Sequence, residues 1–503
     1  MKTHGCGWQT LVSILSALSA GLPRESRPRR FRPLPGPGHL GELGSMARAG
    51  QVGVVIVAVV AAVLGMPGVN SDRAHAGEAA AGEQAAAFEP LVNQARRAGL
   101  RVLEGRRLVL VTDRPARPGD GVAELPAIFD QAFATWCDHY GMSVDDADDW
   151  RALGCLVVDR EQFRAAGLLP AGVPEFANGF CDGSRFWLMD QSNPAYRRHL
   201  LLHEGVHAFT LTRRGLATPV WYTEGIAEYL ATHRLERDAD GLPRFVATPI
   251  PDRPEDVEQL GRIEAIQELR AAGRCPAIED VLAQPVTDHS AIANYASSWA
   301  AVALLANHPT TAAAFAKLER GQLGPNLNEQ LGALPAWNPD RAARDFDAFT
   351  DGLDYGWDFS RMAIDWTAAP PLEAPRELTV AADRGWQNAG VSLAAGKRYA
   401  LAAHGRVGLG SVTDEASSLV TPLESEPAGI SLEWYRGRPI GRLLAAQWGV
   451  DQPGSRPRFV VVAEGDASEF TARFDGPVYL RVNDSPRGLT DNTGGYSVSL
   501  RPL

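Results

Sequence analysis

The sequence has no excess of basic residues. It contains 49 Lys and Arg against 60 Asp and Glu, which gives a formal net charge of -11. Nucleic-acid binding depends on clustered Lys and Arg that neutralise phosphates, so the acidic balance gives no sign of a nucleic-acid partner. The hydrophobic fraction of 45% is ordinary for a globular protein, and 503 residues are enough for two or three domains.

The chain also lacks an apolar run of the length that spans a membrane. The apolar block Val52–Met66 has 15 residues, whereas a spanning helix needs about 20. A start at Met46 precedes the block, and Ala74-His75-Ala76 follows it with the A-x-A shape of a signal-peptidase site. We expect residues 1–76 to be a targeting segment and the protein to be exported to the periplasm, cell surface or medium. An uncleaved membrane anchor is the alternative.

Cysteine is scarce, with five residues in the chain. The four that follow the targeting segment are Cys137, Cys155, Cys181 and Cys275. In an oxidising compartment an even set permits one or two disulfides, and four buried free thiols are the alternative. Their spacing matches no zinc motif, so they indicate no metal site.

The stretch Asn193–Gly215 predicts one long helix that carries the motif His203-Glu204-Gly205-Val206-His207. Asn193 and Pro194 form a helix start, and Gly215 is a natural stop. Residues four apart share a helix face, so His203 and His207 can hold one zinc ion through their imidazoles. Glu204 lies one step around the helix, where a general base is needed.

A catalytic zinc site needs a third protein ligand, and Glu224 follows His207 by 17 residues. That distance allows a second helix to fold back onto the first. Glu228 lies one turn beyond Glu224, and we expect its carboxylate to accept the outer N–H of a ligating histidine. His199 and His203 are an alternative pair, which we rank lower because no glutamate then occupies the position of the base.

HEGVH followed by WYTEGIAEY resembles the gluzincin metallopeptidases, the thermolysin-like and aminopeptidase-like group with two histidines and a distal glutamate on zinc. The resemblance spans about residues 85–365 and implies a peptidase domain over 77–370. It implies that His203, His207 and Glu224 are zinc ligands, that Glu204 is the base and that peptides or proteins are the substrates. It also suggests Tyr295 as the oxyanion donor, although Ser298 stands where the Tyr-x-x-Gly pattern has glycine.

The fold expected for this region is α+β. Apolar, β-branched runs at 107–112, 154–159 and 184–190 predict strands, and helices are expected at 85–100, 125–140 and 160–166. After Glu228 the chain looks helical, and we expect helices at 254–272, 278–283, 292–306, 311–320 and 340–352. The resemblance implies that the 178–190 hairpin binds extended peptide; otherwise it only supports the motif helix.

A Pro-rich linker is predicted at 367–375, and the sequence pattern after it is no longer helical. Short apolar runs between turn residues predict eight strands and an all-β sandwich over residues 371–503. The runs lie at 377–382, 397–403, 430–435, 442–448, 458–464, 469–474, 477–482 and 496–500.

The stretch from Gly476 to Leu500 resembles the calcium-dependent galactose-binding bacterial lectins of the PA-IL type. The resemblance implies a loop that holds a Ca²⁺ ion and a sugar through Asp484, the Gly488 carbonyl, Asp491 and Asn492. Residue 491 is an aspartate where these lectins have asparagine. An ordinary Asp/Asn/Gly turn and calcium binding without sugar are the alternatives.

Together these patterns favour an exported zinc metallopeptidase with an accessory β-sandwich that binds calcium or carbohydrate. A secreted binding protein that keeps the peptidase scaffold without activity is the first alternative. A zinc amidase acting on cell-wall material is the second, because the same chemistry attacks other amide carbonyls. A membrane is expected as a partner only if the apolar block remains attached.

Overall fold

The computed structural model describes residues 80–503, apart from residues 148, 216–217, 259, 286–291, 336 and 415–418. These described residues belong to one compact unit, Val54–Leu503. The expected targeting segment at 1–76 lies outside them. Among the described helices none is both long and apolar enough to cross a membrane.

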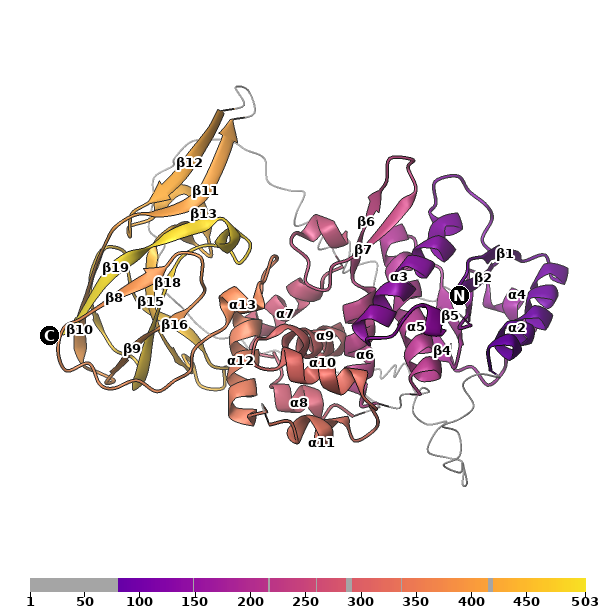
Figure 1. The fold of residues 1–503 in the computed structure, drawn as a ribbon, viewed down its shortest axis with the longest axis horizontal. Helices are drawn as coiled ribbons and strands as arrows, with labels where there is room; N and C mark the ends of the chain where they lie inside the picture. Colours follow the sequence, from indigo (N-terminus) through magenta and orange to yellow (C-terminus); the bar gives the residue numbers. More distant parts are fainter. Residues whose placement is uncertain are drawn as a thin grey trace, which may run out of the picture. The chain divides into compact units, whose positions relative to one another are not determined.

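The N-terminal region contains a five-stranded sheet (Figure 1). Its three central strands are parallel, and each edge strand runs antiparallel to its neighbour. In spatial order the strands are β1 (Arg101–Glu104), β2 (Leu108–Thr112), β3 (Ala152–Val157), β5 (Arg185–Met189) and β4 (Gly179–Asp182). The three strands predicted here are confirmed within two residues, and β1 adds a short edge strand that the sequence analysis did not predict.

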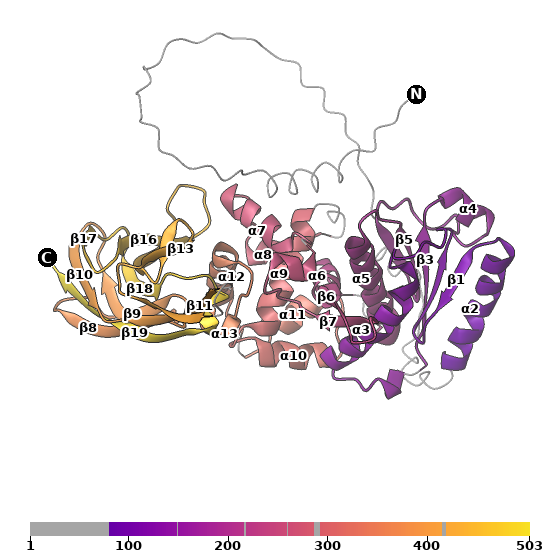
Figure 2. The ribbon, with the colours of Figure 1, turned by 90° about the horizontal axis from the view of Figure 1, so that it is seen from above.

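Helices cover both faces of this sheet (Figure 2). Side chains alternate along a strand, so Leu108 and Leu110 join the core beneath α3 (Leu125–His139) and α5 (Pro194–Arg213). Val109 and Val111 point the other way, into the cluster that includes side chains of α2 (Ala80–Arg97) and α4 (Arg160–Ala165). Burial on both faces explains why β2 and β3 consist of buried residues throughout.

The chain after α5 is mainly helical, as predicted, but two details differ. The strands β6 (His233–Arg237) and β7 (Pro243–Ala247) were not predicted; they form an antiparallel hairpin whose turn is held by the Asp238 side chain. The helix expected at 254–272 is broken, because Glu258 (φ 48°) and Gly261 (φ 85°) take left-handed conformations before α7. The helices are α6 (Val220–Ala231), α7 (Arg262–Ala271), α8 (Ile278–Leu282), α9 (Ile292–Asn307), α10 (Ala312–Arg320), α11 (Leu327–Gly332), α12 (Pro339–Gly352) and α13 (Phe359–Met362).

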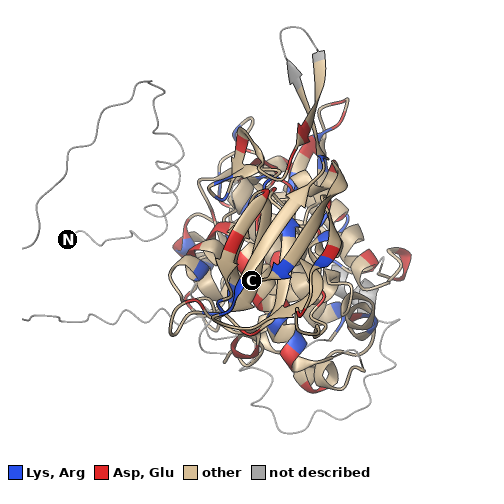
Figure 3. Ribbon diagram, turned by 90° about the vertical axis from the view of Figure 1, so that its left-hand side faces the viewer, with Lys and Arg blue, Asp and Glu red and all other residues tan. Residues whose placement is uncertain are grey.

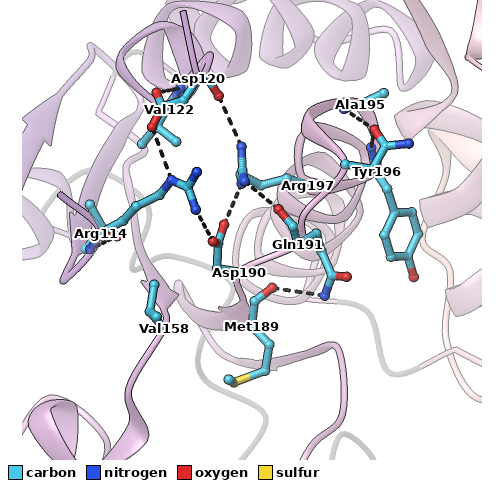
Figure 4. A network of polar contacts seen from close by, with 12 residues as sticks. Arg114, Asp120, Val122, Val158, Met189, Asp190, Gln191, Ala195, Tyr196 and Arg197 are labelled. Carbon is cyan, nitrogen blue, oxygen red and sulfur yellow. Dashed lines mark hydrogen bonds and ion pairs between the residues drawn. The ribbon is translucent and has the colours of Figure 1, made fainter. Parts of the chain in front are cut away.

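An arginine–aspartate network fixes the start of α5 against the sheet (Figure 4). Asp190, just after β5, accepts hydrogen bonds from Arg114 and from Arg197, whose Nε lies 2.6 Å from Asp190 Oδ1. Arg114 also donates to Asp120 over 3.1 Å, and Arg197 donates to the Asp120 carbonyl. Because Arg197 belongs to the first turn of α5, the network fixes where the helix begins relative to β5.

The C-terminal region is all β, as predicted. One path of strands runs β12-β11-β19-β10-β17 with β8 also paired to β19, and a four-stranded sheet runs β16-β15-β18-β9. The buried side chains of both sheets meet in one core cluster. The strands are β8 (Arg376–Ala381), β9 (Gln387–Leu393), β10 (Arg398–His404), β11 (Val407–Asp414), β12 (Leu419–Ser425), β13 (Ile430–Tyr435), β14 (Arg438–Ile440), β15 (Leu443–Gly449), β16 (Arg458–Glu464), β17 (Ala467–Thr471), β18 (Gly476–Val482) and β19 (Asn492–Pro502).

The eight predicted strands are present, and the sequence analysis missed β9, β11, β12 and β14. Two of the missed strands contain a glycine with positive φ, Gly390 in β9 and Gly410 in β11. The pairing register of β11 with β12 also shifts between Gly408 and Ser411. Such glycines and bulges interrupt the apolar alternation by which a strand is recognised in a sequence.

Charged residues of both signs are interspersed along the C-terminal strands (Figure 3). Arg398 pairs with Glu469, and Arg406 reaches Glu424 and Glu426, all on exposed side chains. The described part of this region therefore shows no block of basic charge of the kind that binds polyanions.

The segment predicted as a linker packs against the C-terminal sheets. Leu372 is buried in their core, and Pro371 forms a bridge with Ser392. A further apolar cluster joins Ala348 of α12 to Phe459 of β16. Next to it, Arg456 donates two 2.8 Å hydrogen bonds to the buried carboxylate of Asp347 in α12. The two regions thus share an interface of apolar and ionic contacts.

We predict that Asp190→Ala destabilises the protein by about 3 kcal/mol, because it leaves the buried Arg197 and its neighbour Arg114 without their shared carboxylate. Chemical denaturation monitored by circular dichroism measures this difference. The control is Glu104→Ala, which removes an exposed pair with Arg96 and should cost less than about 1 kcal/mol. Equal effects of the two substitutions would contradict this role of the network.

Candidate metal centre

The motif helix α5 lies where the sequence predicted it. The Asn193 side chain caps its first turn by accepting the N–H of Ala195 over 2.8 Å, and Pro194 is its first residue. Gly215, with φ 63°, follows the helix end at Arg213. His203, Glu204 and His207 are all buried. The motif side chains therefore project into the interior of the N-terminal region.

Two glycines let neighbouring helices approach the motif closely. A Cβ added to Gly205 would overlap Phe129 and lie 2.8 Å from Trp136, both on α3. A Cβ added to Gly225 would overlap the Ser298 carbonyl of α9. Gly225 follows Glu224 directly, so close packing of α6 on α9 determines where that carboxylate lies. The site depends on these glycines because any side chain would separate the helices.

His203, His207 and Glu224 converge on one point. The two histidine Nε2 atoms are 3.1 Å apart, and Glu224 Oε2 lies 3.3 Å from His203 Nε2 and 3.5 Å from His207 Nε2. Tetrahedral zinc with bonds of about 2.0–2.2 Å places its ligand atoms roughly 3.3–3.5 Å apart. The three residues thus form a donor set whose chemistry and spacing suit zinc, with two imidazoles and one carboxylate.

The charges around these donors affect one another strongly. Burial alone would lower the pKa of His203, but hydrogen bonding to Glu224 and Glu228 raises it to about 10. Burial opposes ionisation of Glu224, yet the positive charge of the histidines holds its pKa well below the usual range. Without a metal ion, a proton on His203 therefore supplies positive charge in the cluster.

Glu204 lies beside the edge strand β4. Its side chain is buried, and burial raises the pKa of the carboxyl group. A Cβ added to Gly179, the first residue of β4, would overlap the Glu204 carboxylate. The carboxylate therefore lies against the strand backbone at a point where only glycine leaves room.

Tyr295 on α9 lies next to the histidines. Its ring centroid is 6.0 Å from that of His203, and burial together with nearby carboxylates raises the pKa of its hydroxyl well above the usual value. The hydroxyl therefore keeps its proton at neutral pH and can donate a hydrogen bond. Ser298, where the family pattern has glycine, contributes the carbonyl that packs against Gly225.

Glu228 accepts contacts from three side chains. Its Oε1 lies 3.2 Å from His203 Nδ1, and its Oε2 lies 3.2 Å from His199 Nε2. Arg262 of α7 donates to both oxygens, over 2.7 and 2.8 Å. The sequence analysis named Glu228 for this position and missed Arg262, which lies 34 residues away with no motif around it.

Three further side chains near the motif are buried. His233, in β6, accepts a hydrogen bond from Arg198, and burial together with that arginine lowers its pKa to about 3. Trp221 and Tyr222 belong to the main core. The Tyr222 hydroxyl donates to the buried Glu319.

The four described cysteines are free and buried, and no disulfide joins any two of them. Cys155 belongs to the cluster on the α2 side of the sheet, whereas Cys181 belongs to the core on the α5 side. The sheet separates these two thiols. Of the alternatives considered for these residues, the structure has four buried thiols.

In the C-terminal region the four residues of the lectin-like loop come together. Asp484 and Asn492 are buried, and Asn492 Nδ2 donates to Asp484 Oδ2 over 3.0 Å. Asn492 Oδ1 is buried without a hydrogen-bond partner. A Cβ on Gly488 would overlap Asp484 Oδ1, and one on Gly410 would overlap the Asp491 carboxylate. The loop therefore gathers several oxygens, of which one buried amide oxygen is unpaired.

The same loop also contacts the N-terminal region. Leu489, in the short 3-10 turn Gly488–Thr490, is fully buried within the main core cluster that contains Trp357 and Phe359. A Cβ on Gly356 would overlap Arg487. Thr490 and Asp491 remain exposed. One side of the loop is thus packed against the helical region, and the side carrying Asp491 faces outward.

No model of a known protein family matches the chain, and no curated protein matches it. Among solved structures, a chain described as an EclA N-terminal domain and PllA-like lectin is similar to it. The similarity has 22% sequence identity and a TM-score of 0.18, covering 26% of this chain and 98% of that chain. It is partial and weak, and it says nothing about binding or activity of this protein.

We predict that zinc binding to the metal-free protein releases about one proton per ion at pH 7. A metal ligand must be deprotonated, and the pKa of about 10 for His203 means that this proton has to leave. Apparent affinity should rise about tenfold per pH unit from pH 7 to pH 9 and level off above about pH 10. Titration calorimetry in buffers of different protonation enthalpy measures the release. Equal heats in all buffers would contradict the prediction.

Proposed function

We propose that this protein is an exported, zinc-dependent hydrolase that cleaves peptide bonds, built on a zincin-like α+β domain over residues 77–370. The observation that supports it most directly is the convergence of His203 Nε2, His207 Nε2 and Glu224 Oε2 at separations of 3.1–3.5 Å. Glu204 is buried beside them, in the position that a general base requires. The complete set favours an enzyme over a scaffold that has lost its activity.

In this proposal each residue has one task. His203, His207 and Glu224 would hold zinc, and bound zinc supplies Lewis acidity that polarises a carbonyl and makes water acidic near neutral pH. Glu204 accepts the proton of the attacking water and passes it to the leaving amine. Tyr295 donates a hydrogen bond to the oxygen on which negative charge develops. Glu228 orients His203 from the side opposite Glu224.

The edge strand β4 offers a place for an extended peptide. It pairs with β5 on one side, and in the described part of the chain no strand pairs with its other side. An unpaired strand edge binds extended peptides through main-chain hydrogen bonds. Because Gly179 touches the Glu204 carboxylate, a peptide on this edge would pass close to the base. This arrangement supports a peptide rather than a compact substrate, although cell-wall peptide amides have the same backbone chemistry.

We predict that Glu204→Gln abolishes hydrolysis, by at least about a thousandfold, and keeps the metal. The amide cannot accept the proton, whereas the three ligands are untouched. A digest of a peptide library measures activity, and atomic absorption measures zinc. His203→Ala is the matched variant and should lose both. Undiminished hydrolysis by Glu204→Gln, or no zinc in the unmodified protein, would refute the enzymatic proposal and favour a non-catalytic binding protein.

We further propose that the loop at 484–492 binds Ca²⁺ and, through it, a carbohydrate hydroxyl. The specific support is Asn492 Oδ1, a buried acceptor without a partner beside the buried carboxylate of Asp484. Buried polar atoms are normally satisfied, so an ion that takes up this oxygen explains the arrangement. The exposed carboxylate of Asp491 leaves one side of the loop open to a sugar.

We predict that excess calcium stabilises the protein by about 2–3 kcal/mol at a hundredfold excess over Kd. Asp484→Asn should lose most of this gain, because it removes the buried charge while keeping the side-chain shape. The control is Asp491→Asn, which restores the lectin pattern and should retain calcium binding. Thermal unfolding in calcium and in EGTA measures the shift, and retention on galactose resin tests the sugar. Identical curves in calcium and EGTA would rule out the ion site.

A further inference from the structure

The facing helices α5 and α6 contain two possible metal sites rather than one. His199, His203 and His207 follow one another at intervals of four on α5, and Glu224 and Glu228 do so on α6. Two groups of three therefore have ligand atoms within 4.8 Å of one another: His203/His207/Glu224 and His199/His203/Glu228. Both offer two imidazoles and a carboxylate, and they share His203.

The ligand types do not distinguish these two groups, because they are identical. Local burial does not exclude the second group either, since all its residues are buried. The difference lies in what else contacts each glutamate. In the described part of the chain, the ion-pair partners of Glu224 are the two histidines of its own group. Glu228, in contrast, is already paired with a permanent cation.

Arg262 donates hydrogen bonds to both carboxylate oxygens of Glu228. Its Nε donates to Oε2 over 2.7 Å and its Nη2 donates to Oε1 over 2.8 Å. Both side chains are almost fully buried, with exposed fractions of 10% and 3%. The pair is bidentate and shielded from water, so its charges are screened little. A dication beside Glu228 would have to approach this guanidinium closely.

The arginine is held in place from a second side. Its guanidinium lies over the ring of Tyr295 at 5.9 Å from the centroid. It is the first residue of α7, which begins directly after Gly261 in its left-handed conformation. Arginine keeps its charge at any physiological pH, and its planar fork matches a carboxylate in a way that lysine does not. Arg262 is therefore a fixed positive charge between the two helices and α9.

We propose that Arg262 determines the position of the metal ion, by keeping a cation out of the His199/His203/Glu228 group and leaving His203/His207/Glu224 as the only group that binds one. This inference rests on the proposed zinc site and extends it from ligand identity to site selection. In this arrangement Glu228 remains free to contact His203 Nδ1 and His199 Nε2. Arg262 is a positioning residue, since its side-chain hydrogen bonds go to Glu228, which is not one of the three proposed ligands.

The test removes the first group and asks whether the second one can bind. Zinc per chain is measured by atomic absorption after equilibrium dialysis of the full chain. The unmodified protein should hold one ion, and His207→Ala should lose it, with at least about a hundredfold weaker binding. His207→Ala combined with Arg262→Met should regain one ion in the second group. Adding His199→Ala to that double variant should abolish binding again.

The matched control is His207→Ala with Arg262→Lys, which keeps a positive charge and should bind no ion. Circular dichroism shows whether each variant is folded. If the Arg262→Met variants do not fold, the single variant His207→Ala can still overturn the inference, because it retains Arg262 and the complete second group. Full zinc binding by His207→Ala alone would overturn the inference, since the ion would then occupy the second group beside the arginine.

The remaining outcomes separate this inference from the proposed function. Two ions in the unmodified protein would overturn the role of Arg262 and leave a zinc site in place. One ion in the unmodified protein and none in the folded His207→Ala/Arg262→Met variant would also overturn the role of Arg262 and leave the zinc site in place. No zinc in the unmodified protein would refute the proposed function, and the inference would then fail as well unless the double variant gains an ion.

Discussion

The balance of buried charge between α5 and α6 is the constraint on which the rest of the site depends. Glu204, Glu224 and Glu228 lie with three histidines in a region that excludes most water. Unpaired charge in such a place costs several kcal/mol, so each carboxylate needs a defined partner. Arg262 supplies one positive charge, and protonated histidine or a bound cation supplies the rest. A proton on His203, or a cation held by the proposed ligands, would therefore balance the same buried negative charge.

Close packing makes this arrangement possible. The helices that carry the charges meet at Gly205 and Gly225, where side chains of α3 and backbone of α9 occupy the space of a missing Cβ. Behind them, the five-stranded sheet and the Asp190 network fix where α5 begins. Groups placed on such rigid elements hold their positions within a fraction of an ångström, which is what catalysis or metal selectivity requires.

Features that depend on residues close together in the sequence could be predicted, and those that depend on distant residues could not. Residue types and spacing predicted the helix that carries His203 and His207. They also predicted that Glu224, on the next helix, lies near these histidines. The β6–β7 hairpin was missed because both strands are only partly buried and β6 is largely polar, so they lack the apolar runs that marked the equally short β2 and β5. Arg262 could not be found, since nothing in the neighbouring sequence marks a side chain whose partner lies 34 residues away. The neutral state of His233 likewise depends on Arg198, brought near only by the fold.

The insertion of Leu489 into the core of the helical region has a consequence for how the molecule unfolds. This side chain comes from the C-terminal loop, yet it packs within the cluster that also holds the motif helix. Together with the Asp347–Arg456 pair, it provides apolar and ionic contacts between the two regions. Each region would lose these contacts if it were separated from the other. Such shared contacts make melting cooperative across a domain boundary. The C-terminal β region then acts as part of the same folding unit as the helical region, and a chain cut at the Pro-rich segment would lose stability in its N-terminal half.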